Sequence, residues 1–329
     1  MKQVVLEAKI HDDGLKLLTQ EVEVIGPISD HAQVIEWLKN GVHGLIVGSG
    51  LAVTEGLMAD SPGVEAVGRP GVGVDNIDLP GATAQGVIAV YTPDGPTEST
   101  AEHAVALIMA LAKRVRLGDV AIRRSGFSQR TGLTGVELWG KTLGIVGLGR
   151  IGGRVAEICG KGLGMKVIAY DPYIPAERFT QCGAERRPDL QSMLREADFV
   201  TLHTPLSPET RGMIGAAELA LMKPTAYLVN TSRGPVVDES ALFAALREKR
   251  IAGAGLDVYT QEPIPFPHPF LELDNVILTP HIASSTEDGL WKMGVTVAEE
   301  MLTALRGEKP RFMANPQVWE RRTRVRRKG

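Results

Sequence analysis

One short glycine-rich segment constrains the fold of this chain more than any other feature. The segment reads Gly147-Leu148-Gly149-Arg150-Ile151-Gly152. It follows an apolar run at 143–146 and precedes residues with helical spacing and a second apolar run, 166–170, which ends at Asp171. Glycines at such a junction allow a tight turn, and the first helical turn offers N–H groups to a pyrophosphate. The segment therefore predicts a strand, a helix and a second strand that bind a dinucleotide.

The acidic residue after the second run narrows the choice of dinucleotide. A carboxylate about 20 residues beyond the glycines can bind the ribose hydroxyls. Asp171 stands in that place, and its charge would repel the 2′-phosphate of NADP. NAD is therefore the predicted cofactor, and the alternative is a glycine-rich turn without a ligand.

Similar short apolar runs recur along the chain, with helical segments between them. They cover residues 4–6, 44–47, 64–67, 87–90, 143–146, 166–170, 199–202, 227–229, 255–258 and 276–278. Strands that alternate with helices predict mostly parallel, doubly wound α/β sheets. These strands are too many for one sheet of ordinary size. We therefore expect two such units, with a boundary near the turn residues 93–96.

The composition excludes several classes of protein. The chain has 329 residues, with 36 basic and 39 acidic residues, so a net charge of −3 gives no general attraction to nucleic acid or anionic membranes. Its longest strongly apolar stretch, 104–112, is shorter than the roughly 20 residues of a membrane span. Two cysteines do not make a disulfide framework, and the N-terminus lacks the apolar core of a signal peptide. A cytoplasmic location is expected.

The end of the chain is locally basic. Six of the eight residues 321–328 are Arg or Lys. No aromatic residue follows Trp319 to stack on bases, so a solvated, poorly ordered tail is favoured over a nucleic-acid-binding arm.

A dinucleotide fold does not determine the reaction, so catalytic residues must be found separately. Hydride transfer to a keto acid needs a cation for the carboxylate and an acid/base for the alcohol proton. Arg233, Glu262 and His281 each come shortly after one of the last three apolar runs. Ligands bind at that edge of open α/β sheets. No Cys/His cluster has the spacing of a zinc site, so no metal is expected.

In these segments and in several others, the chain resembles the D-isomer-specific 2-hydroxyacid dehydrogenases. The matching segments are 69–78 (RPGVGVDNID), Ala101-Glu102, 138–143 (LWGKTL) leading into the glycine motif, 203–206 (HTPL), and those around Arg233, Glu262 and His281. They occur in the family's order over nearly the whole chain. Within the family, segments 74–78 and 170–173 and Asn315-Pro316 are most similar to the branch of phosphoglycerate dehydrogenase and hydroxypyruvate reductase.

The resemblance implies a Rossmann cofactor domain inserted into a flavodoxin-like substrate domain. The expected bounds are 99–282 for the cofactor domain and 1–98 with 283–329 for the substrate domain. A short form of the enzyme without a C-terminal regulatory domain is expected. Feedback inhibition by serine through such a domain is therefore not expected. The family also implies a homodimer formed through a long helix at 99–117 and an arm reaching Trp139.

The resemblance also implies a role for each site residue. Arg233 would bind the substrate carboxylate and carbonyl oxygen, His281 would transfer the hydroxyl proton, and Glu262 would hydrogen-bond the imidazole and favour its protonated form. Backbone groups of Val72 and Gly73 would bind the carboxylate. Besides the glycines and Asp171, the cofactor contacts would be Arg150, Ile151, Thr204, Thr231, Asp257 and Ser284. His203 is interpreted as a hydrogen-bonding loop residue; the histidines left as structural are His11, His31, His43, His103 and His268.

The predicted activity is NAD-dependent interconversion of a D-2-hydroxy acid and its 2-keto acid, with 3-phosphoglycerate as the first substrate. A glyoxylate or hydroxypyruvate reductase is the alternative within the enzymes, because the sequence has no unambiguous phosphate clamp. Arg69 is a possible phosphate contact. The alternative outside the enzymes is a binding protein that senses NADH, similar to the family's transcriptional corepressors.

Overall fold

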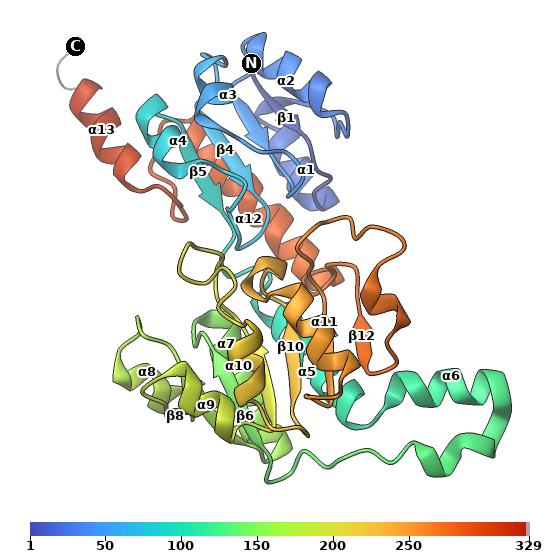
Figure 1. Ribbon diagram of the computed structural model, residues 1–329. Helices are drawn as coiled ribbons and strands as arrows, with labels where there is room; N and C mark the ends of the chain where they lie inside the picture. Colours follow the sequence, from blue (N-terminus) through green and yellow to red (C-terminus); the bar gives the residue numbers. More distant parts are fainter. Residues whose placement is uncertain (327–329) are drawn as a thin grey trace. The chain divides into compact units, whose positions relative to one another are not determined.

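The computed structural model describes residues 1–326 of the chain, apart from the side chains of 322–326. The chain forms two compact units, one of Met1–Pro96 together with the residues from Ser285 onward, the other of Thr97–Ser284. Each contains one parallel β-sheet (Figure 1). The sequence analysis expects the unit to change after residues 98 and 282; the structure changes after Pro96 and Ser284. Which unit holds the substrate and which the cofactor stays a prediction.

The first unit has a five-stranded sheet in the order β2-β1-β3-β4-β5. Its strands are β1 (Lys2–Leu6), β2 (Val22–Ile25), β3 (Gly44–Ile46), β4 (Ala66–Arg69) and β5 (Ile88–Tyr91). Its helices are α1 (Asp12–Thr19), α2 (His31–Lys39), α3 (Glu55–Ala59), α4 (Leu79–Gln85), α12 (Glu287–Leu305) and α13 (Gln317–Arg326). All pairings are parallel, and the order is that of flavodoxin-like sheets.

Alternation along β1 builds a core on both faces of this sheet. Val4 and Leu6 belong to the cluster that includes Met301 of α12. Val5 belongs to the opposite cluster, with Leu38 of α2. Successive side chains of a strand point to opposite faces, so a sheet covered on both sides needs apolar residues at consecutive positions.

The second unit has a seven-stranded sheet in the order β12-β11-β10-β9-β6-β7-β8. Its strands are β6 (Thr142–Val146), β7 (Lys166–Tyr170), β8 (Glu185–Arg186), β9 (Phe199–Leu202), β10 (Tyr227–Asn230), β11 (Gly253–Leu256) and β12 (Val276–Leu278). Its α-helices are α5 (Thr97–Ala112), α6 (Val115–Ser125), α7 (Arg150–Glu157), α8 (Ala176–Gln181), α9 (Leu190–Glu196), α10 (Ala216–Leu221) and α11 (Glu239–Arg247). Other helical segments are the 3₁₀-helices η1 (Gly126–Gly132), η3 (Gly234–Val236) and η4 (Pro269–Glu272) and the π-helical turn η2 (Ile158–Gly162).

When β6 to β12 are numbered 1 to 7, the strand order of this unit is 3-2-1-4-5-6-7. The first six strands have the Rossmann order, and β12 adds one strand at the edge. Two doubly wound parallel sheets, the predicted fold class, are therefore confirmed. Apolar clusters cover both faces: Leu143 and Ile145 of β6 lie in the cluster with α5 and α7, while Val146 lies in the cluster with α9 and α11.

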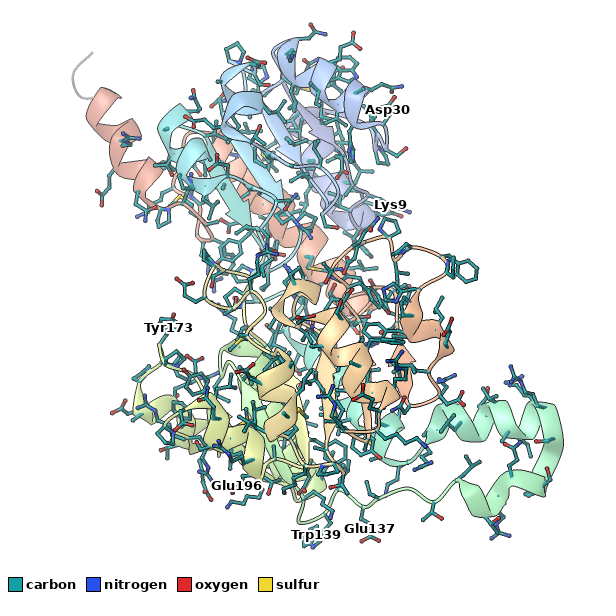
Figure 2. All side chains as sticks on the ribbon, in the orientation of Figure 1. Lys9, Asp30, Glu137, Trp139, Tyr173 and Glu196 are labelled. Atoms are coloured by element: carbon teal, nitrogen blue, oxygen red, sulfur yellow. The ribbon has the colours of Figure 1, made fainter. Side chains whose placement is uncertain are left out.

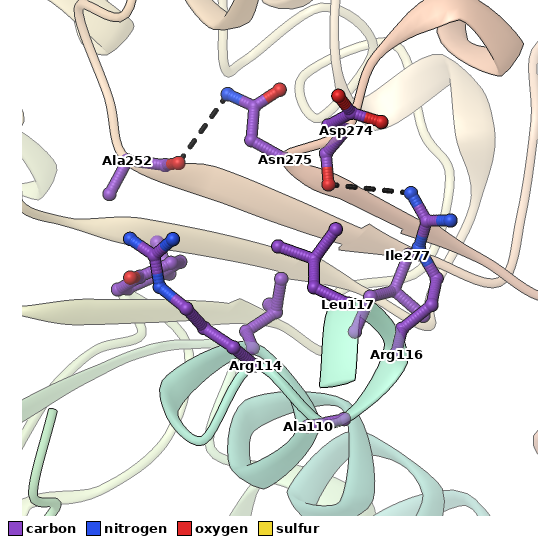
Figure 3. Close-up of a pocket in the computed structure, with 10 residues that line it drawn as sticks. Ala110, Arg114, Arg116, Leu117, Ala252, Asp274, Asn275 and Ile277 are labelled. Carbon is purple, nitrogen blue, oxygen red and sulfur yellow. Dashed lines mark hydrogen bonds between the residues drawn. The ribbon is translucent and has the colours of Figure 1, made fainter. Parts of the chain in front are cut away.

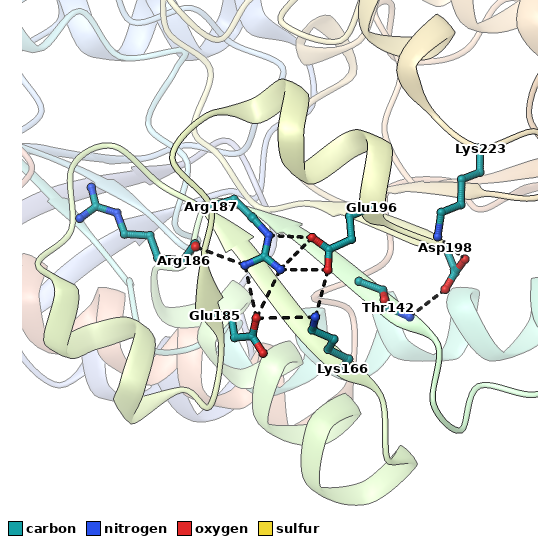
Figure 4. A network of polar contacts seen from close by, with 8 residues as sticks. All are labelled: Thr142, Lys166, Glu185, Arg186, Arg187, Glu196, Asp198 and Lys223. Carbon is teal, nitrogen blue, oxygen red and sulfur yellow. Dashed lines mark hydrogen bonds and ion pairs between the residues drawn. The ribbon is translucent and has the colours of Figure 1, made fainter.

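Charged residues gather near the amino ends of strands in this second sheet (Figure 4). Arg187 donates to both oxygens of Glu196, at 2.8 and 2.9 Å, and Lys166 donates to the same carboxylate at 3.0 Å. Asp198 accepts from Lys223 at 2.8 Å and from the N–H of Thr142 at 2.9 Å. The bonds of Glu196 tie α9 to the start of β7 and to Arg187 after β8, and the bonds of Asp198 tie the residue before β9 to the start of β6 and to the segment before β10.

One expectation about the helices is wrong. The helix expected at 99–117 ends at Ala112, because Arg114 adopts a left-handed conformation with φ +53°, and α6 begins at Val115. The basic run near the end of the chain is helical as far as Arg326, in α13, and the expectation of a solvated, poorly ordered tail stays a prediction. Arg321 of this helix donates to the carbonyl of Thr83. Arg327 and Lys328 of the same basic run lie outside the described residues.

Two strands of the structure, β2 and β8, are not among the apolar runs that predicted strands. β2 carries Glu23 between its apolar residues and lies at the edge of its sheet, and β8 is only two exposed residues long. Among residues 1–326, no helix is both long and apolar enough to cross a membrane. Over the same range, no three His, Cys, Asp or Glu side chains gather as a metal site would require.

Candidate active site

Three neighbouring strands bring the predicted catalytic residues to one edge of the second sheet. β10, β11 and β12 are parallel and pair in that order. Arg233 follows β10, Glu262 lies in the loop after β11, and His281 lies in the loop after β12. The carboxyl ends of parallel strands meet at one edge, so residues far apart in sequence lie on adjacent loops.

His281 and Glu262 are in direct contact. The imidazole Nδ1 lies 2.6 Å from the Oε2 of Glu262, and both side chains are about one third exposed. The other carboxylate oxygen accepts from the N–H of Tyr259 at 3.0 Å. Since Nδ1 faces Glu262, Nε2 is the ring nitrogen left to meet a substrate.

The surroundings of Glu262 favour its ionised form. Burial raises the pKa of this carboxyl group, but its hydrogen bonds with His281 and the Tyr259 N–H, together with the charges of His281 and Arg233, lower the pKa further, so the net shift is downward. An ionised Glu262 can stabilise a positive charge on His281, as an acid that donates a proton requires.

A close backbone contact brings Arg233 to this pair. A Cβ at Gly234 would lie 1.9 Å from the carbonyl carbon of Tyr259, so only glycine allows the loop after β10 to pack against the loop after β11. The guanidinium Nη1 of Arg233 donates to the carbonyl of Ser232 at 2.7 Å. The carbonyl of Arg233 accepts from Asn230 at 2.9 Å. These bonds orient the arginine at the sheet edge.

Asp257, predicted to lie near the nicotinamide amide, is fully buried. Its Oδ1 accepts from the N–H of Ile282 and its Oδ2 from the N–H of Ala283, each at 2.9 Å. The carboxylate is thus bound to the His281 loop. Its role toward a cofactor stays a prediction.

The glycine motif forms the turn between β6 and α7 in the way its pattern predicts. Gly147 has φ +88°, and a Cβ there would lie 2.7 Å from the carbonyl oxygen of His203. At Gly152 a Cβ would lie 2.0 Å from the carbonyl oxygen of Gly147. At Gly149, by contrast, a Cβ would meet nothing within 4 Å. Two of the glycines are required by the protein itself, whereas Gly149 faces open space where the backbone can approach a ligand.

Asp171 ties this turn to the next strand. It follows β7, and its Oδ2 accepts from the N–H of Leu148 at 2.9 Å, while its Oδ1 accepts from the N–H of Tyr173 at 2.9 Å. A carboxylate has about four acceptor positions. Two positions therefore remain for ribose hydroxyls, and the protein fixes the orientation of the group.

Two buried hydroxyls near this edge have no hydrogen-bond partner. They belong to Thr204, after β9, and Thr231, after β10. Buried polar atoms are nearly always hydrogen-bonded, so an unsatisfied hydroxyl at a sheet edge indicates a missing ligand or water. Together with the open space at Gly149, these hydroxyls fit a bound dinucleotide. The other predicted contacts are also on this unit: exposed Arg150 and partly buried Ile151 begin α7, and Ser284 ends the unit.

The predicted carboxylate-binding residues belong to the first unit. Val72 and Gly73 lie in the loop after β4, and Val72 is 39% exposed. The carbonyl of neighbouring Gly71 accepts from the N–H of Thr92 at 3.0 Å. Arg69, the possible phosphate contact, donates to the carbonyl of Pro70 at 2.9 Å.

Sequence reasoning missed two residues at this site. Tyr259 donates from its hydroxyl to the carbonyl of Thr279 at 2.9 Å, and His103 of α5 lies 3.1 Å from the Thr279 hydroxyl. Nothing in the sequence links either residue to the segment around His281. His203 behaves as the sequence predicts: its ring bonds to the Thr201 hydroxyl at 3.0 Å, and burial lowers its pKa to about 3.

Comparison with known proteins identifies the family. Residues 105–283, just over half of the chain, match the model of the D-isomer specific 2-hydroxyacid dehydrogenase NAD binding domain. The chain therefore belongs to the D-isomer-specific 2-hydroxyacid dehydrogenase family.

Individual relatives carry more than one substrate name. The chain is 41% identical over 317 residues to a D-3-phosphoglycerate dehydrogenase of Methanocaldococcus jannaschii, covering 96% of this chain and 60% of the relative. It is 39% identical over 327 residues to a glyoxylate reductase of Pyrococcus furiosus, covering 96% of each. The chain spans 51 to 60% of the length of several phosphoglycerate dehydrogenases that it matches.

Solved structures share the fold. One is an NADPH-dependent glyoxylate/hydroxypyruvate reductase of Sinorhizobium meliloti in complex with NADP and malonate, with a TM-score of 0.85 and 28% identity. The match covers 96% of this chain and 98% of that structure.

Proposed function

We propose that the chain is an oxidoreductase that uses NAD to interconvert a D-2-hydroxy acid and its 2-keto acid. The observation that carries the proposal is the 2.6 Å contact between His281 and an ionised Glu262, with Arg233 on the adjacent loop. A cation next to an acid/base pair suits a substrate with both a carboxylate and a carbonyl group.

Each residue of the triad has one task in the reduction. Arg233 holds the substrate carboxylate and stabilises charge on the carbonyl oxygen. His281 donates a proton from Nε2 to that oxygen, and Glu262 stabilises the imidazolium before the proton is transferred. Bound NADH supplies the hydride. In the oxidation direction His281 accepts the hydroxyl proton.

The second unit is proposed to hold the cofactor and the first to contribute Val72 and Gly73 to substrate binding. The glycine turn and the N-terminus of α7 would bind the pyrophosphate, and Thr204 and Thr231 would find in the cofactor the partners they lack. The fixed carboxylate of Asp171 favours NAD, because it would repel a 2′-phosphate. A kcat/KM for NADPH equal to that for NADH would contradict this preference.

The first substrate proposed is 3-phosphoglycerate with its keto acid, since relatives at 41% identity carry that name. Glyoxylate or hydroxypyruvate is the second candidate. It is favoured by the glyoxylate reductase that matches across 96% of its own length.

A substrate panel tests the proposal. NADH oxidation is measured as kcat/KM with 3-phosphohydroxypyruvate, hydroxypyruvate, glyoxylate and pyruvate. We expect turnover with at least one, and the ratio of phosphorylated to unphosphorylated hydroxypyruvate assigns the branch. No turnover with any of them, together with protein capture that depends on NADH, would favour the corepressor-like alternative.

We also propose a homodimer formed through the segment 113–139 (the arm). In Figure 1, α6 projects from the rest of its unit. Large apolar side chains on the arm are more than one third exposed: Val115, Ile122, Phe127, Val136 and Trp139. Figure 2 labels Trp139 and Glu137 on the irregular segment of the arm that leads back to β6. Exposed apolar residues in such numbers mark an interaction surface.

An open cleft lies at the base of the arm, lined by Arg114, Arg116, Leu117 and Ile277 among others (Figure 3). It offers apolar and cationic groups to a second copy. Light scattering should give twice the chain mass, and replacing Phe127 with Glu should shift the mass toward the monomer. A monomeric unmodified chain would contradict the proposal.

A reducing, cytoplasmic compartment is proposed from the cysteines. Cys159 and Cys182 are free and buried, and burial raises the pKa of the Cys159 thiol to about 12. Burial raises the pKa of the Cys182 thiol as well, and since thiolates are the reactive form, both thiols are less reactive than exposed ones. Thiol titration of the unfolded chain taken from cells should find both reduced.

A further inference from the structure

His281 adopts a backbone conformation that it would not choose alone. Its φ is +53°, in the left-handed region that residues with a Cβ rarely occupy. Such residues persist only where surrounding contacts determine the conformation. The N–H of His281 donates to the carbonyls of Asp257, at 2.8 Å, and Thr279, at 3.1 Å. The next two N–H groups donate to the Asp257 carboxylate. Asp257 therefore determines how the His281 loop is held.

Asp257 in turn depends on Thr279. The Thr279 hydroxyl lies 2.6 Å from Oδ1 of Asp257 and donates to it, because both oxygens of this carboxyl group act as acceptors, toward the N–H groups of Ile282 and Ala283. Asp257 is fully buried, and a buried carboxylate is stable only with such donors around it. The carbonyl of Thr279 is also held, by the hydroxyl of Tyr259.

The remaining contact of the Thr279 hydroxyl comes from a helix distant in sequence. Nε2 of His103, on α5, lies 3.1 Å from Oγ1 of Thr279 and 3.6 Å from Oδ1 of Asp257. Since the single hydroxyl proton goes to Asp257, the Thr279 oxygen accepts from His103, which fixes the proton of that ring on Nε2. The polar chain runs from His103 through Thr279 and Asp257 to the loop of His281.

Resting on the dehydrogenase activity proposed above, we propose that His103 is a positioning residue for the acid/base His281. The bond from His103 fixes the rotamer of the Thr279 hydroxyl, and this hydroxyl completes the donor set of Asp257. Without it the His281 loop would leave the left-handed conformation more often, and the imidazole would spend less time against Glu262. Arg233, the glycine turn and Asp171 lie outside this chain of bonds, and Asp257 keeps its two backbone donors, so binding of the substrate carboxylate and of the cofactor should change little.

Two replacements of His103 separate the hydrogen bond from the packing. His103→Leu keeps the apolar bulk and removes the donor, whereas His103→Gln keeps an N–H at a similar reach. We expect His103→Leu to lower kcat about tenfold with KM for the keto acid and NADH within about twofold, because small displacements of a catalytic group cost rate. His103→Gln should restore kcat to within about threefold of the unmodified chain.

His43→Leu is the matched control. His43 accepts a hydrogen bond from the N–H of Gln3 in the first unit, so its replacement also removes a partly buried histidine. We expect it to leave kcat unchanged. An unchanged kcat in His103→Leu, or an equal loss in the Leu and Gln variants, would overturn the proposal.

Amide hydrogen exchange tests the same chain of bonds without turnover. Protection of the Ile282 and Ala283 amides should fall in His103→Leu and persist in His103→Gln, even if none of the keto acids reacts. Unchanged protection in His103→Leu would refute the positioning role whatever the activity. If His103→Leu does not fold, Thr279→Val and Thr279→Ser replace the pair, and equal kcat values in these two variants would also overturn the proposal.

Discussion

The two ends of the seven-stranded sheet treat polar groups in opposite ways. At the amino ends, Arg187 with Glu196 and Lys223 with Asp198 face each other at 2.8 Å. At the carboxyl ends, the hydroxyls of Thr204 and Thr231 are buried without partners, and the backbone of His281 is left-handed. The same sheet positions both sets of residues.

The difference shows which end of the sheet carries groups that lower the stability of the fold. Opposite charges in contact near the amino ends lower each other's free energy, whereas unsatisfied hydroxyls and a left-handed residue each cost about 1–3 kcal/mol. A fold can keep such costs where bound molecules or the reaction make use of the groups, although left-handed Arg114 and Lys249 lie outside the site and serve turns. Replacements at the carboxyl end should therefore change activity or binding more than stability, and replacements at the amino end should do the reverse.

The largest effect is expected at His281. His281→Asn removes the group that transfers the proton, and kcat should fall about 10²–10⁴-fold, the range for loss of a general acid. NADH binding, followed by fluorescence titration, should stay near that of the unmodified chain. Glu102→Gln, an exposed change on α5, serves as the control. Normal turnover in His281→Asn would refute the assignment of the acid/base.

Two glycine replacements distinguish a glycine that leaves room for the cofactor from a glycine that packing within the protein requires. Gly149→Ala places its Cβ where nothing lies within 4 Å, so the variant should fold with an unchanged melting temperature. Its NADH dissociation constant should rise about tenfold or more, because the methyl group takes room needed by the pyrophosphate. Gly152→Ala places its Cβ 2.0 Å from the carbonyl oxygen of Gly147 and should lose stability as well as binding. Unchanged NADH binding in Gly149→Ala would contradict the predicted cofactor loop.

At the amino end, Asp198→Asn should affect stability alone. Burial raises the pKa of Asp198, but the Lys223 bond and the Thr142 N–H lower it more, so the net shift is downward from 3.8. A carboxyl group with a lowered pKa stabilises the fold above its ordinary pKa and loses this effect as the pH falls through its folded-state value. The variant should be about 1–2 kcal/mol less stable at pH 7.

The pH series is the check on this reasoning. Urea unfolding at several pH values should show the gap between Asp198→Asn and the unmodified chain closing at acid pH, with kcat unchanged at pH 7. A gap that stays constant from pH 7 to acid pH would show that lost packing, rather than charge, causes the destabilisation.

The contrast between the ends also explains what the sequence can predict. Local patterns placed the glycine turn, Asp171 and the ends of β10, β11 and β12, since each depends on a strand followed by turn residues. The fold class followed from the number and alternation of the strands. Short polar β8 has no such pattern, and the break at Arg114 depends on a single left-handed residue that no glycine marks.

Contacts between distant segments could not be predicted in this way. His103, Asp257 and Thr279 come from α5 and from the ends of two strands, and only the folded sheet brings them within 3.6 Å of one another. Sequence reasoning left His103 as structural because a histidine on a helix has many ordinary roles. That the Thr231 hydroxyl lacks a hydrogen-bond partner could not be predicted from the sequence either, because it depends on the groups that the fold places around it.

The smallest and most specific effect is expected at Thr231. Thr231→Val replaces a buried hydroxyl without a partner by a methyl group of nearly the same shape, so the free protein should gain up to about 1 kcal/mol of stability. The same change should weaken NADH binding about two- to tenfold, because the bound cofactor would lose one hydrogen bond. Asn230 and Ser232 beside it bond to each other and keep the loop in place. A variant that loses stability and keeps its NADH affinity would show that the hydroxyl serves the fold, and the two ends of the sheet would then differ less than their geometry indicates.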